Sequence, residues 1–248
     1  VINCYNSDTY LKEAIDSVYS QTYKKWEIIF FDNASTDKSA EIANSYDKKL
    51  VYIKNKKLVP LYEARNLAIN HCTGGAIAFL DADDIWMPEK LCSQIIEMKS
   101  GENFIYTGYK THNIFTKKEV CYNNIYCVKN PTEILRENCI SISSVLINKD
   151  IFNEFKFNSI YNILGDIDLW QRILNKHKFI STKKIQVINR IHESNLSSKL
   201  CDKWLIERRL FYKRMLFESN RKISLTLIFY IIKTEIKGIV FFVKRNLR

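Results

Sequence analysis

The sequence predicts an α/β fold with a mostly parallel central sheet, flanking helices and a helical extension at the C-terminus. Apolar strand patterns alternate with amphipathic helix patterns through the first part of the chain, an order typical of parallel sheets. Hydrophobic residues make up 46% of the 248 residues, which is enough for a sizeable core. From Trp204 onward, aromatic and aliphatic residues are interleaved with arginine and lysine, which indicates amphipathic helices.

Seven elements are predicted before residue 81. In order they are a strand over 1–6, a helix over 8–21 capped by Ser7 or Asp8, a buried strand over Trp26–Phe31 ending at Asp32-Asn33, a helix that Ser35-Thr36-Asp37 starts and that reaches about Tyr46, a strand over Leu50–Lys54, a helix over Leu61–Cys72 and a strand over Ala76–Leu80. Ligands of parallel sheets bind beyond the carboxyl ends of the strands. Because Asn3 to Asn6, Asp32-Asn33 and Asp81 to Asp84 all lie at such ends, we expect them to share one pocket.

The net charge of +11 is concentrated at one end of the chain. Residues 203–248 carry twelve Lys or Arg and three Glu, a net +9, which leaves only +2 for residues 1–202. The nearly neutral body argues against a nucleic-acid-binding module, so we expect no nucleic acid partner.

The cysteines and the first residues bear on compartment and completeness. Seven scattered cysteines without a Cys-x-x-Cys pair argue against a zinc or redox centre and favour a reducing compartment. The chain begins at Val1 inside an apolar strand pattern and has no initiator Met, so we expect a few residues to precede it.

Only six glycines are present, and they form neither a G-x-G-x-x-G nor a G-x-x-x-x-G-K-[ST] segment. A backbone cradle for phosphates is therefore not expected. If the pocket holds a nucleotide, its diphosphate must be met by a metal on aspartates or by basic side chains.

The sequence Phe79-Leu80-Asp81-Ala82-Asp83-Asp84 delivers three carboxylates at the end of a predicted buried strand. Crowded carboxylates repel one another and resist desolvation unless a cation compensates them, and Mg²⁺ or Mn²⁺ prefers oxygen ligands. The alternative is a solvated turn in which Asp84 caps the helix that begins near Pro88. The cluster alone leaves both interpretations open.

Several segments together resemble the family 2 inverting glycosyltransferases of GT-A fold, whose central sheet is Rossmann-like. The segments that carry the resemblance are Tyr5-Asn6, Tyr10-Leu11, Ala14-Ile15-Asp16-Ser17-Val18, Gln21-Thr22-Tyr23, Glu27-Ile28-Ile29, Asp32-Asn33-Ala34-Ser35-Thr36-Asp37, Ala64-Arg65-Asn66 and Phe79 to Asp84. The likeness covers about the first 95 residues and reappears around 165–198. It implies a donor-binding half over 1–115, an acceptor and catalytic-base half of the same domain over 116–200, and a basic amphipathic helical tail over 201–248.

The resemblance implies a nucleoside-diphosphate sugar donor, with UDP or dTDP as its nucleotide. It places Asn3 and Tyr5 at the base, with Asp32 and Asn33 near the edge of the ring. Asn33 stands where many relatives carry Asp, and an amide can still pair with a pyrimidine. Asn33 is equally consistent with a turn residue.

The resemblance also implies a metal site on the acid cluster. Asp83 would ligate the Mn²⁺ or Mg²⁺ that bridges the two donor phosphates, and Asp81 would contact the donor or a metal-bound water. The metal would neutralise charge on the departing nucleoside diphosphate.

A catalytic base is expected in the second half. Gly165-Asp166-Ile167-Asp168-Leu169-Trp170-Gln171-Arg172 is similar to the family's Glu-Asp-x-Asp-Leu-Trp-x-Arg segment, which makes Asp166 the base that deprotonates the acceptor hydroxyl. Gly165 replaces the usual Glu. Alternatively, Asp166 caps a helix whose apolar residues face the core, and Asp168 should point elsewhere.

Three basic residues complete the expected site. Asn189 to Ser197 is similar to the family's Arg-x-His-x-x-Ser-x-Ser stretch, which implies that Arg190 or His192 approaches the donor phosphates. His192 is also consistent with a surface histidine. Arg65 either approaches the nucleotide or pairs with Glu63 or another acid on the helix surface.

Residues 203–248 predict a membrane-surface segment. The apolar run Ile223–Ile232 is too short to span a bilayer, whereas basic residues beside Leu, Phe and Tyr suit a helix lying on an anionic inner leaflet. Ordinary helices packed on the core are the alternative. We therefore expect a cytoplasmic, peripheral membrane glycosyltransferase that acts on a glycan or lipid-linked acceptor of bacterial surface polysaccharide or glycolipid synthesis. The rival hypothesis is a catalytically silent sugar-nucleotide-binding or scaffolding subunit.

Overall fold

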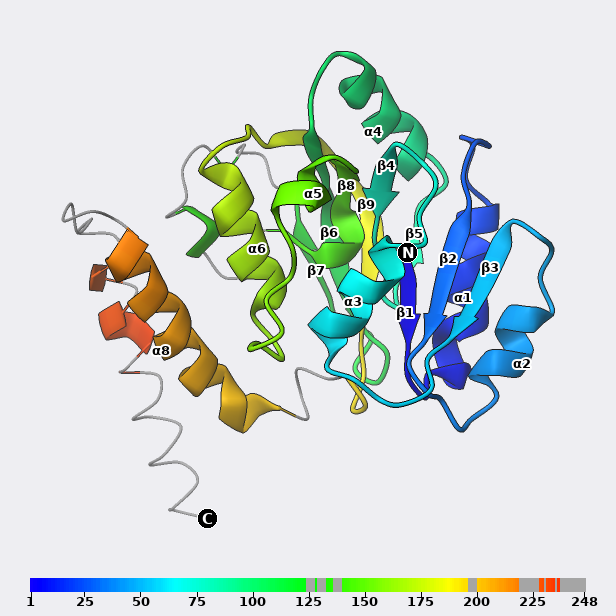
Figure 1. The fold of residues 1–248 in the computed structure, drawn as a ribbon, viewed down its shortest axis with the longest axis horizontal. Coiled ribbons are helices and arrows are strands. Elements are labelled where there is room, and N and C mark those ends of the chain that lie inside the picture. The colour runs from blue at the N-terminus through cyan, green and yellow to red at the C-terminus, as the bar shows by residue number, and fades with distance from the viewer. Residues whose placement is uncertain are drawn as a thin grey trace.

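The computed structural model describes residues 1–123, 128, 133–135, 140–195, 200–218, 228–229, 231–234 and 236. Its first sheet contains β1 (Ile2–Cys4), β2 (Ile28–Asp32) and β3 (Leu50–Lys54), which pair in parallel in the order β1-β2-β3 (Figure 1). All five residues of β2 are buried, as the continuous apolar run predicts. The parallel β-α-β opening is confirmed.

The second sheet has six strands in the order β4-β8-β6-β9-β5, with β7 added to β6. These strands are β4 (Ala76–Ala78), β5 (Ile85–Trp86), β6 (Phe104–Asn113), β7 (Glu119–Tyr122), β8 (Val145–Asn148) and β9 (Ile180–Ile191). Only β6 and β9 pair in parallel; the other neighbours are antiparallel. The α/β fold with flanking helices is confirmed, but β4 pairs antiparallel with β8 rather than continuing the parallel order. Local periodicity does not encode a partner that lies about 70 residues later in the chain.

The two sheets meet at the first residue. The Val1 amine donates to the Ala78 carbonyl oxygen at 2.7 Å, and the Leu80 N–H donates to the Val1 carbonyl oxygen at 3.0 Å. The amino-terminal end of β1 therefore lies beside residues 78–80, which run into the acid cluster.

Helices cover both sheets (Figure 1). They are α1 (Asp8–Tyr19), α2 (Ser39–Asn44), α3 (Leu61–Ile69), α4 (Lys90–Lys99), α5 (Ile151–Glu154), α6 (Gly165–Leu174) and α8 (Cys201–Glu218), with short 3-10 turns η1 (Glu133–Leu135) and η2 (Ile142–Ser144).

The second helix begins four residues later than the sequence predicts. Asp32 Oδ1 accepts the Ser35 N–H at 2.7 Å, and Asp37 Oδ1 accepts the Ser39 N–H at 3.0 Å. Ala34 also adopts a left-handed φ of 66°. These side-chain acceptors hold residues 33–38 as a turn, so Ser35 does not cap a helix.

One core cluster packs α3 and α6 against the second sheet. Phe104 stacks on Phe179 with ring centroids 3.7 Å apart, and the edge of Trp170 of α6 meets Phe104. Phe211 and Met215 of α8 belong to the same cluster. A second cluster packs α1 against β1, β2 and Trp86.

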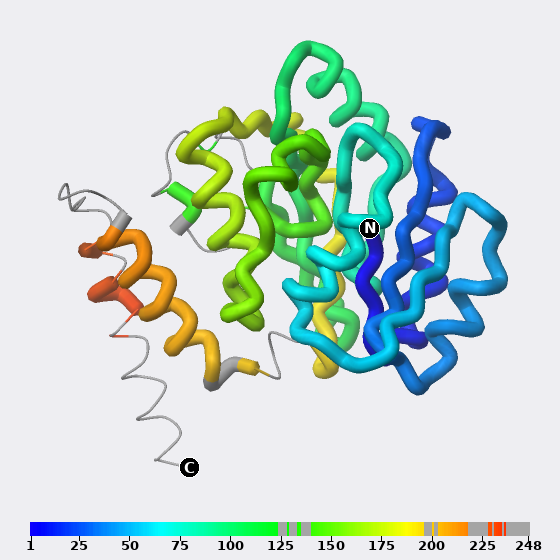
Figure 2. Tube along the Cα trace, viewed as in Figure 1, coloured from blue at the N-terminus to red at the C-terminus, as the bar shows by residue number. Residues whose placement is uncertain are grey.

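The inner face of α8 is therefore part of the hydrophobic core that also contains α6 and the second sheet. Figure 2 shows α8 beside α6 at one end of the molecule, with the first sheet at the other end. The helical extension is confirmed for the described residues. Among those residues, no helix combines the length and the apolar character that crossing a membrane requires.

A cavity of about 430 Å³ lies at the amino-terminal ends of β1, β2 and β4. Val1, Trp26 and Gly75 are among the residues that line it, and none of the predicted site residues does so. The predicted site lies at the other ends of these strands.

Candidate active site

The segments that follow β1 and β2 come together as the parallel order requires. The Asn33 N–H donates to the Cys4 carbonyl oxygen at 2.8 Å. Asn6 Oδ1 accepts the Thr36 N–H at 2.8 Å, and the Asn6 N–H donates to Ser35 Oγ at 3.1 Å. The predicted base-binding residues therefore share one region of the surface.

Asp32 and Asn33 are buried and occupied by protein partners. Asp32 Oδ2 accepts the Tyr52 hydroxyl at 2.6 Å, in addition to the Ser35 amide on Oδ1. Asn33 donates to the Val59 carbonyl at 2.8 Å and accepts the Val59 N–H at 3.1 Å. Both side chains clearly hold turns, and their contact with a base stays a prediction.

Two other predicted donor contacts are less engaged. The Tyr5 side chain is 47% exposed, so its ring is available for stacking. The Asn3 Nδ2 is buried without a hydrogen-bond partner among the described residues. A buried amide without a partner is costly, which makes Asn3 a candidate for contact with a ligand.

The carboxylates of Asp81, Asp83 and Asp84 offer oxygen atoms within 4.8 Å of one another. Asp84 is buried, accepts the Ser143 hydroxyl at 2.6 Å and accepts the Arg190 N–H at 3.1 Å. The suggested cap role of Asp84 is wrong: α4 begins at Lys90 and is preceded by Glu89. Ser143 of η2 and Arg190 of β9 bind the carboxylate instead, because these two elements flank this segment.

Asp83 faces a second group of ligating atoms. Its Oδ2 lies 2.9 Å from His192 Nε2 and accepts Asn195 Nδ2 at 2.8 Å. Burial, followed by repulsion from Asp81, raises the pKa of Asp83 above its ordinary value. The His192 side chain is 7% exposed, so the surface-histidine alternative is wrong.

Arg65 links the acid cluster to the second half of the site. It is buried, and its guanidinium donates to Asp81 Oδ1 at 2.6 Å. The guanidinium also lies over the rings of Tyr62 and Phe157 at 5.3 and 5.7 Å. Asp81 is therefore the acid with which Arg65 pairs.

Arg190 pins β9 to α1. Its guanidinium donates to the Asp83 carbonyl oxygen, to the Glu13 carboxylate and, at 3.1 Å, to the Tyr10 carbonyl oxygen. It also lies 4.8 Å from the centroid of the Tyr10 ring. These contacts fix the backbone of Asp83, and contact between Arg190 and a phosphate stays a prediction.

Asp166 lies in the first turn of α6 and is partly exposed. Its Oδ1 accepts the Ile167 N–H at 2.8 Å and lies 3.4 Å from the Tyr62 hydroxyl. Desolvation raises the pKa of Asp166 to about 6, against an opposing effect of the Arg65 charge. A carboxylate in this range is ionised at neutral pH and can still take up a proton.

Asp168 has a different role. It is fully buried, pairs with Arg172 within α6 and lies 2.9 Å from Arg214 Nε of α8. Asp168 thus points elsewhere than Asp166, as the sequence predicts.

Sequence reasoning missed three residues of the site. They are Ser143, Asn195 and Glu207, whose partners lie 59, 112 and 43 to 45 residues away. The available signals were a run of serines within an apolar segment and a single acid between residues 203 and 217.

The residues around Asp83 fit a divalent cation. Octahedral ligands at about 2.1 Å from such an ion lie about 3 Å apart, close to the separation of Asp83 Oδ2 and His192 Nε2. Burial, followed by repulsion from Asp81, raises the pKa of Asp83, and a bound cation would favour its ionised form. Two partly exposed carboxylates and an imidazole form a donor set that Mn²⁺ accepts.

Comparison with known proteins places these observations in a family. A profile described as "Glycosyl transferase family 2" matches residues 1–155. The chain is 30% identical over 244 residues to the UDP-Glc:alpha-D-GlcNAc-diphosphoundecaprenol beta-1,3-glucosyltransferase WfaP of Escherichia coli, covering 96% of this chain and 93% of WfaP. It is 31% identical over 205 residues to WfgD of the same organism, described in the same words, covering 80% and 78%.

Solved structures show the fold. S. aureus TarS in complex with UDP-GlcNAc matches with a TM-score of 0.72 and 17% identity, covering 90% of this chain and 66% of the TarS chain. The mannosyltransferase PcManGT of Pyrobaculum calidifontis, in complex with GDP-Man and Mn²⁺, matches with a TM-score of 0.62 and 15% identity, covering 94% and 67%.

The sheet order and the match to these structures show that the chain has the GT-A fold. The chain belongs to glycosyl transferase family 2.

Proposed function

We propose that the protein is a metal-dependent inverting glycosyltransferase that moves one sugar from a UDP-sugar to a lipid-linked acceptor. The observation that carries the proposal is the position of Arg65, which binds Asp81 of the acid cluster and acts electrostatically on Asp166. One buried arginine therefore interacts both with the acid cluster that would bind the diphosphate and with the carboxylate that would serve as the base. An inverting displacement needs both groups close together.

Asp83, Asp81 and His192 are the residues that would hold Mn²⁺ or Mg²⁺. The ion would supply Lewis acidity at the departing diphosphate. Asn195 and Arg190 keep Asp83 in place through its side chain and its carbonyl oxygen. Ser143 and the Arg190 N–H do the same for Asp84.

Asp166 takes the proton of the acceptor hydroxyl while the oxygen of that hydroxyl attacks the anomeric carbon of the donor. The bond to the diphosphate breaks on the opposite face, so the configuration at that carbon inverts in one step. The pKa of about 6 keeps Asp166 ionised at neutral pH.

The relatives support UDP as the nucleotide. WfaP and WfgD are described as users of UDP-Glc, and a TarS structure contains UDP-GlcNAc. Asn3 and Tyr5 would contact the base directly, whereas Asp32 and Asn33 would shape the pocket through the turns that they hold. A dTDP-sugar is the alternative donor.

A lipid-linked acceptor agrees with the outer face of α8. Lys203, Ile206, Leu210, Lys213 and Phe217 are exposed at helical spacings of three and four. Glu207, the one acid between residues 203 and 217, is buried on the opposite face.

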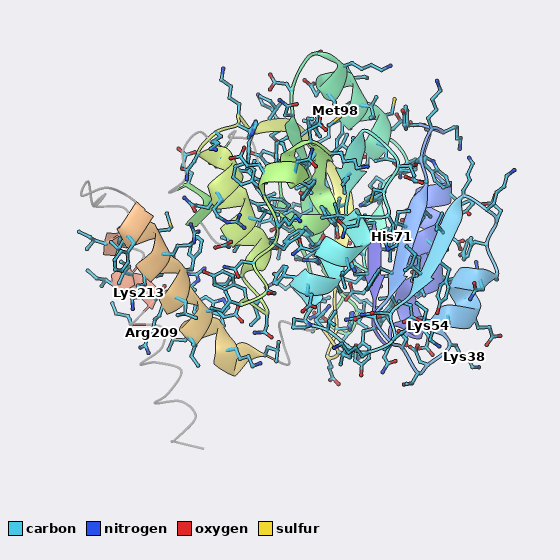
Figure 3. All side chains as sticks on the ribbon, in the orientation of Figure 1. Lys38, Lys54, His71, Met98, Arg209 and Lys213 are labelled. Carbon is cyan, nitrogen blue, oxygen red and sulfur yellow. The ribbon has the colours of Figure 1, made fainter. Side chains whose placement is uncertain are left out.

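Between residues 203 and 217 this face presents basic and apolar side chains and no acid, a pattern that suits an anionic bilayer. Arg209 and Lys213 lie on the side of α8 turned away from the sheets (Figure 3). We place the enzyme at the inner face of the cell membrane.

A transfer assay tests the proposal. The purified chain is given UDP-glucose, Mn²⁺ and a GlcNAc-diphosphopolyprenol acceptor, and we expect a disaccharide lipid that is absent when EDTA is added. Asp83→Ala should lose both product formation and the Mn²⁺-dependent part of calorimetric UDP binding. Unchanged UDP affinity in this variant would contradict the metal assignment.

The silent-subunit alternative predicts UDP-sugar binding without transfer or donor hydrolysis. To separate it from a wrong choice of sugar or acceptor, hydrolysis of a panel of UDP- and dTDP-sugars is measured alongside. Binding of several donors without turnover of any would favour the silent subunit.

A further inference from the structure

We propose that Glu207 of α8 and Tyr62 of α3 are positioning residues for Asp166. The inference rests on the proposed function, because it assigns these two side chains to the placement of the catalytic base. Both bind the turn at 162–164, which leads directly into α6.

Glu207 organises the amide groups of this turn. One carboxylate oxygen accepts the Asn162 N–H at 2.7 Å and Asn162 Nδ2 at 3.0 Å. The other accepts the Ile163 and Leu164 N–H groups at 2.9 and 3.1 Å. Glu207 is only 3% exposed, so its carboxylate is stabilised by these four hydrogen-bond donors rather than by water.

Tyr62 fixes the same turn from the other side. Its hydroxyl donates to the Ile163 carbonyl oxygen at 2.7 Å and lies 3.4 Å from Asp166 Oδ1. Consecutive amides are thus held by α8, while the carbonyl between them is held by α3.

The Tyr62 ring also explains Gly165. A Cβ atom at position 165 would lie 2.5 Å from the ring carbons of Tyr62, which is too close for any other residue. The Tyr62 ring therefore occupies the space that the side chain of the Glu expected from the resemblance would need. In this chain, the support of the base comes from α3 and α8.

Asp166 needs this external support because its own contacts are few. Among the described residues, its carboxylate has two hydrogen-bond partners: the Ile167 N–H at 2.8 Å and the more distant Tyr62 hydroxyl at 3.4 Å. The direction of the carboxylate therefore follows the direction in which α6 begins. A base displaced by about 1 Å can lose about 100-fold in rate.

Glu207→Gln tests the inference in the full chain. The amide keeps one acceptor oxygen but presents an NH₂ group to a backbone N–H donor. We expect kcat to fall about 10- to 100-fold, while the KM for the donor and the calorimetric affinity for UDP with Mn²⁺ change less than about twofold, because the donor contacts lie elsewhere.

Arg208→Gln is the matched control. Arg208 is the neighbouring buried charge on α8, and its described hydrogen-bond and ring contacts, with Trp204, Tyr212 and Thr234, all lie within residues 204–234. It should lower thermal stability to a similar extent yet keep kcat. Equal losses of kcat in both variants would reduce Glu207 to a general packing role and overturn the inference.

Amide hydrogen exchange separates this inference from the proposed function. Glu207→Gln should speed exchange at Ile163 and Leu164 without changing exchange in β2, whether or not transfer is detected. If Glu207→Gln does not fold, Tyr62→Phe provides the second test, with an expected loss of kcat and retained UDP affinity. If the wild type transfers sugar and a folded Glu207→Gln or Tyr62→Phe variant has the same kcat, the positioning role alone would be overturned. Absence of transfer in the wild type would instead contradict the proposed function.

Discussion

The proposed metal end of the site, around Asp81, Asp83 and Asp84, and the proposed base end, around Asp166, are built differently. At the metal end, the carboxylates of Asp83 and Asp84 each have two polar partners, and the Arg190 guanidinium binds three groups on two segments, α1 and the Asp83 backbone. At the base end, Asp166 has one short hydrogen bond and is partly exposed. A carboxylate that binds a cation must be held still, whereas one that receives a proton needs a free oxygen.

The two ends also differ in what surrounds them. The metal end is supported by η2 and β9, which belong to the second sheet and its core. The base end is supported by α3 and α8, of which α8 comes from the basic tail. The carboxylate that we propose as the base is thus attached to the part of the chain that we expect to meet the membrane.

The largest expected effect separates the two ends directly. Asp166→Asn should lower kcat about 10²- to 10⁴-fold, because the amide cannot accept the acceptor proton. UDP affinity with Mn²⁺ should stay within about threefold, since the metal end is unchanged; that threefold corresponds to only about 0.65 kcal/mol. Calorimetry and steady-state rates on the same preparation check this, and an active Asp166→Asn enzyme would remove Asp166 as the base.

Ser143→Ala probes the other end. It leaves the buried Asp84 carboxylate and the Asp81 N–H without the hydroxyl at 2.6 and 3.1 Å. Loss of such outer support typically costs about 10- to 100-fold in metal affinity. Mn²⁺ titration followed by electron paramagnetic resonance measures the affinity. Ser143→Thr, which keeps the hydroxyl, is the control, and equal Mn²⁺ affinities in all three proteins would show that Ser143 does not support the metal end.

The outer face of α8 gives the next effect. Lys203→Gln with Lys213→Gln removes two basic residues, each of which contributes about 1 kcal/mol to binding near an anionic surface. Binding to vesicles that contain about 30% phosphatidylglycerol should therefore weaken roughly 30-fold. Co-sedimentation measures the binding.

The control for α8 removes exposed residues of the same kinds elsewhere. Phe115→Ser, Lys117→Gln and Lys118→Gln lie on the β6–β7 turn, where all three side chains are exposed. Vesicle binding that falls equally in both variants, or no binding by the wild type, would contradict a specific role of α8. Dissociation of a dimer by the α8 variant in light scattering would identify the face as a contact between copies.

The smallest effect concerns the pH profile of kcat/KM. The pKa of Asp166 is raised to about 6, so the base is protonated as the pH falls through this value, and the rate should drop about tenfold per pH unit below it. A bound divalent cation favours the ionised form, so the inflection in the complete enzyme lies at or below about 6. A rate that stays constant from pH 7 to pH 4 would be incompatible with a carboxylate base.

Much of this site could be predicted because its residues follow strands or begin a helix in recognisable order. The first parallel strands were predicted from local patterns and are confirmed, as is the family assignment. Asp83 and Asp166 were assigned through the family resemblance, and their roles stay predictions. Ser143, Asn195 and Glu207 could not be identified in this way, because each acts on residues more than 40 positions away. The antiparallel pairing of β4 with β8 has the same origin, since the register depends on contacts that no local period encodes.

The boundaries of α2 and the role of Asp84 were wrong for a related reason. Short polar side chains near a turn can cap a helix or bind the backbone of another segment, and the sequence does not distinguish these outcomes. Asp37 bridges to the Asp8 N–H at 3.0 Å, and Asp84 binds β9 instead of α4. Packing of the two sheets decides between the alternatives.

The anomeric configuration of the product tests the central claim most directly. Given an α-linked UDP-sugar, a single displacement with Asp166 as base must give a β-linked product, which proton NMR of the purified glycan distinguishes from the α anomer. We predict only the β product. An α-linked product would contradict the single-displacement mechanism, whatever the rates of the variants.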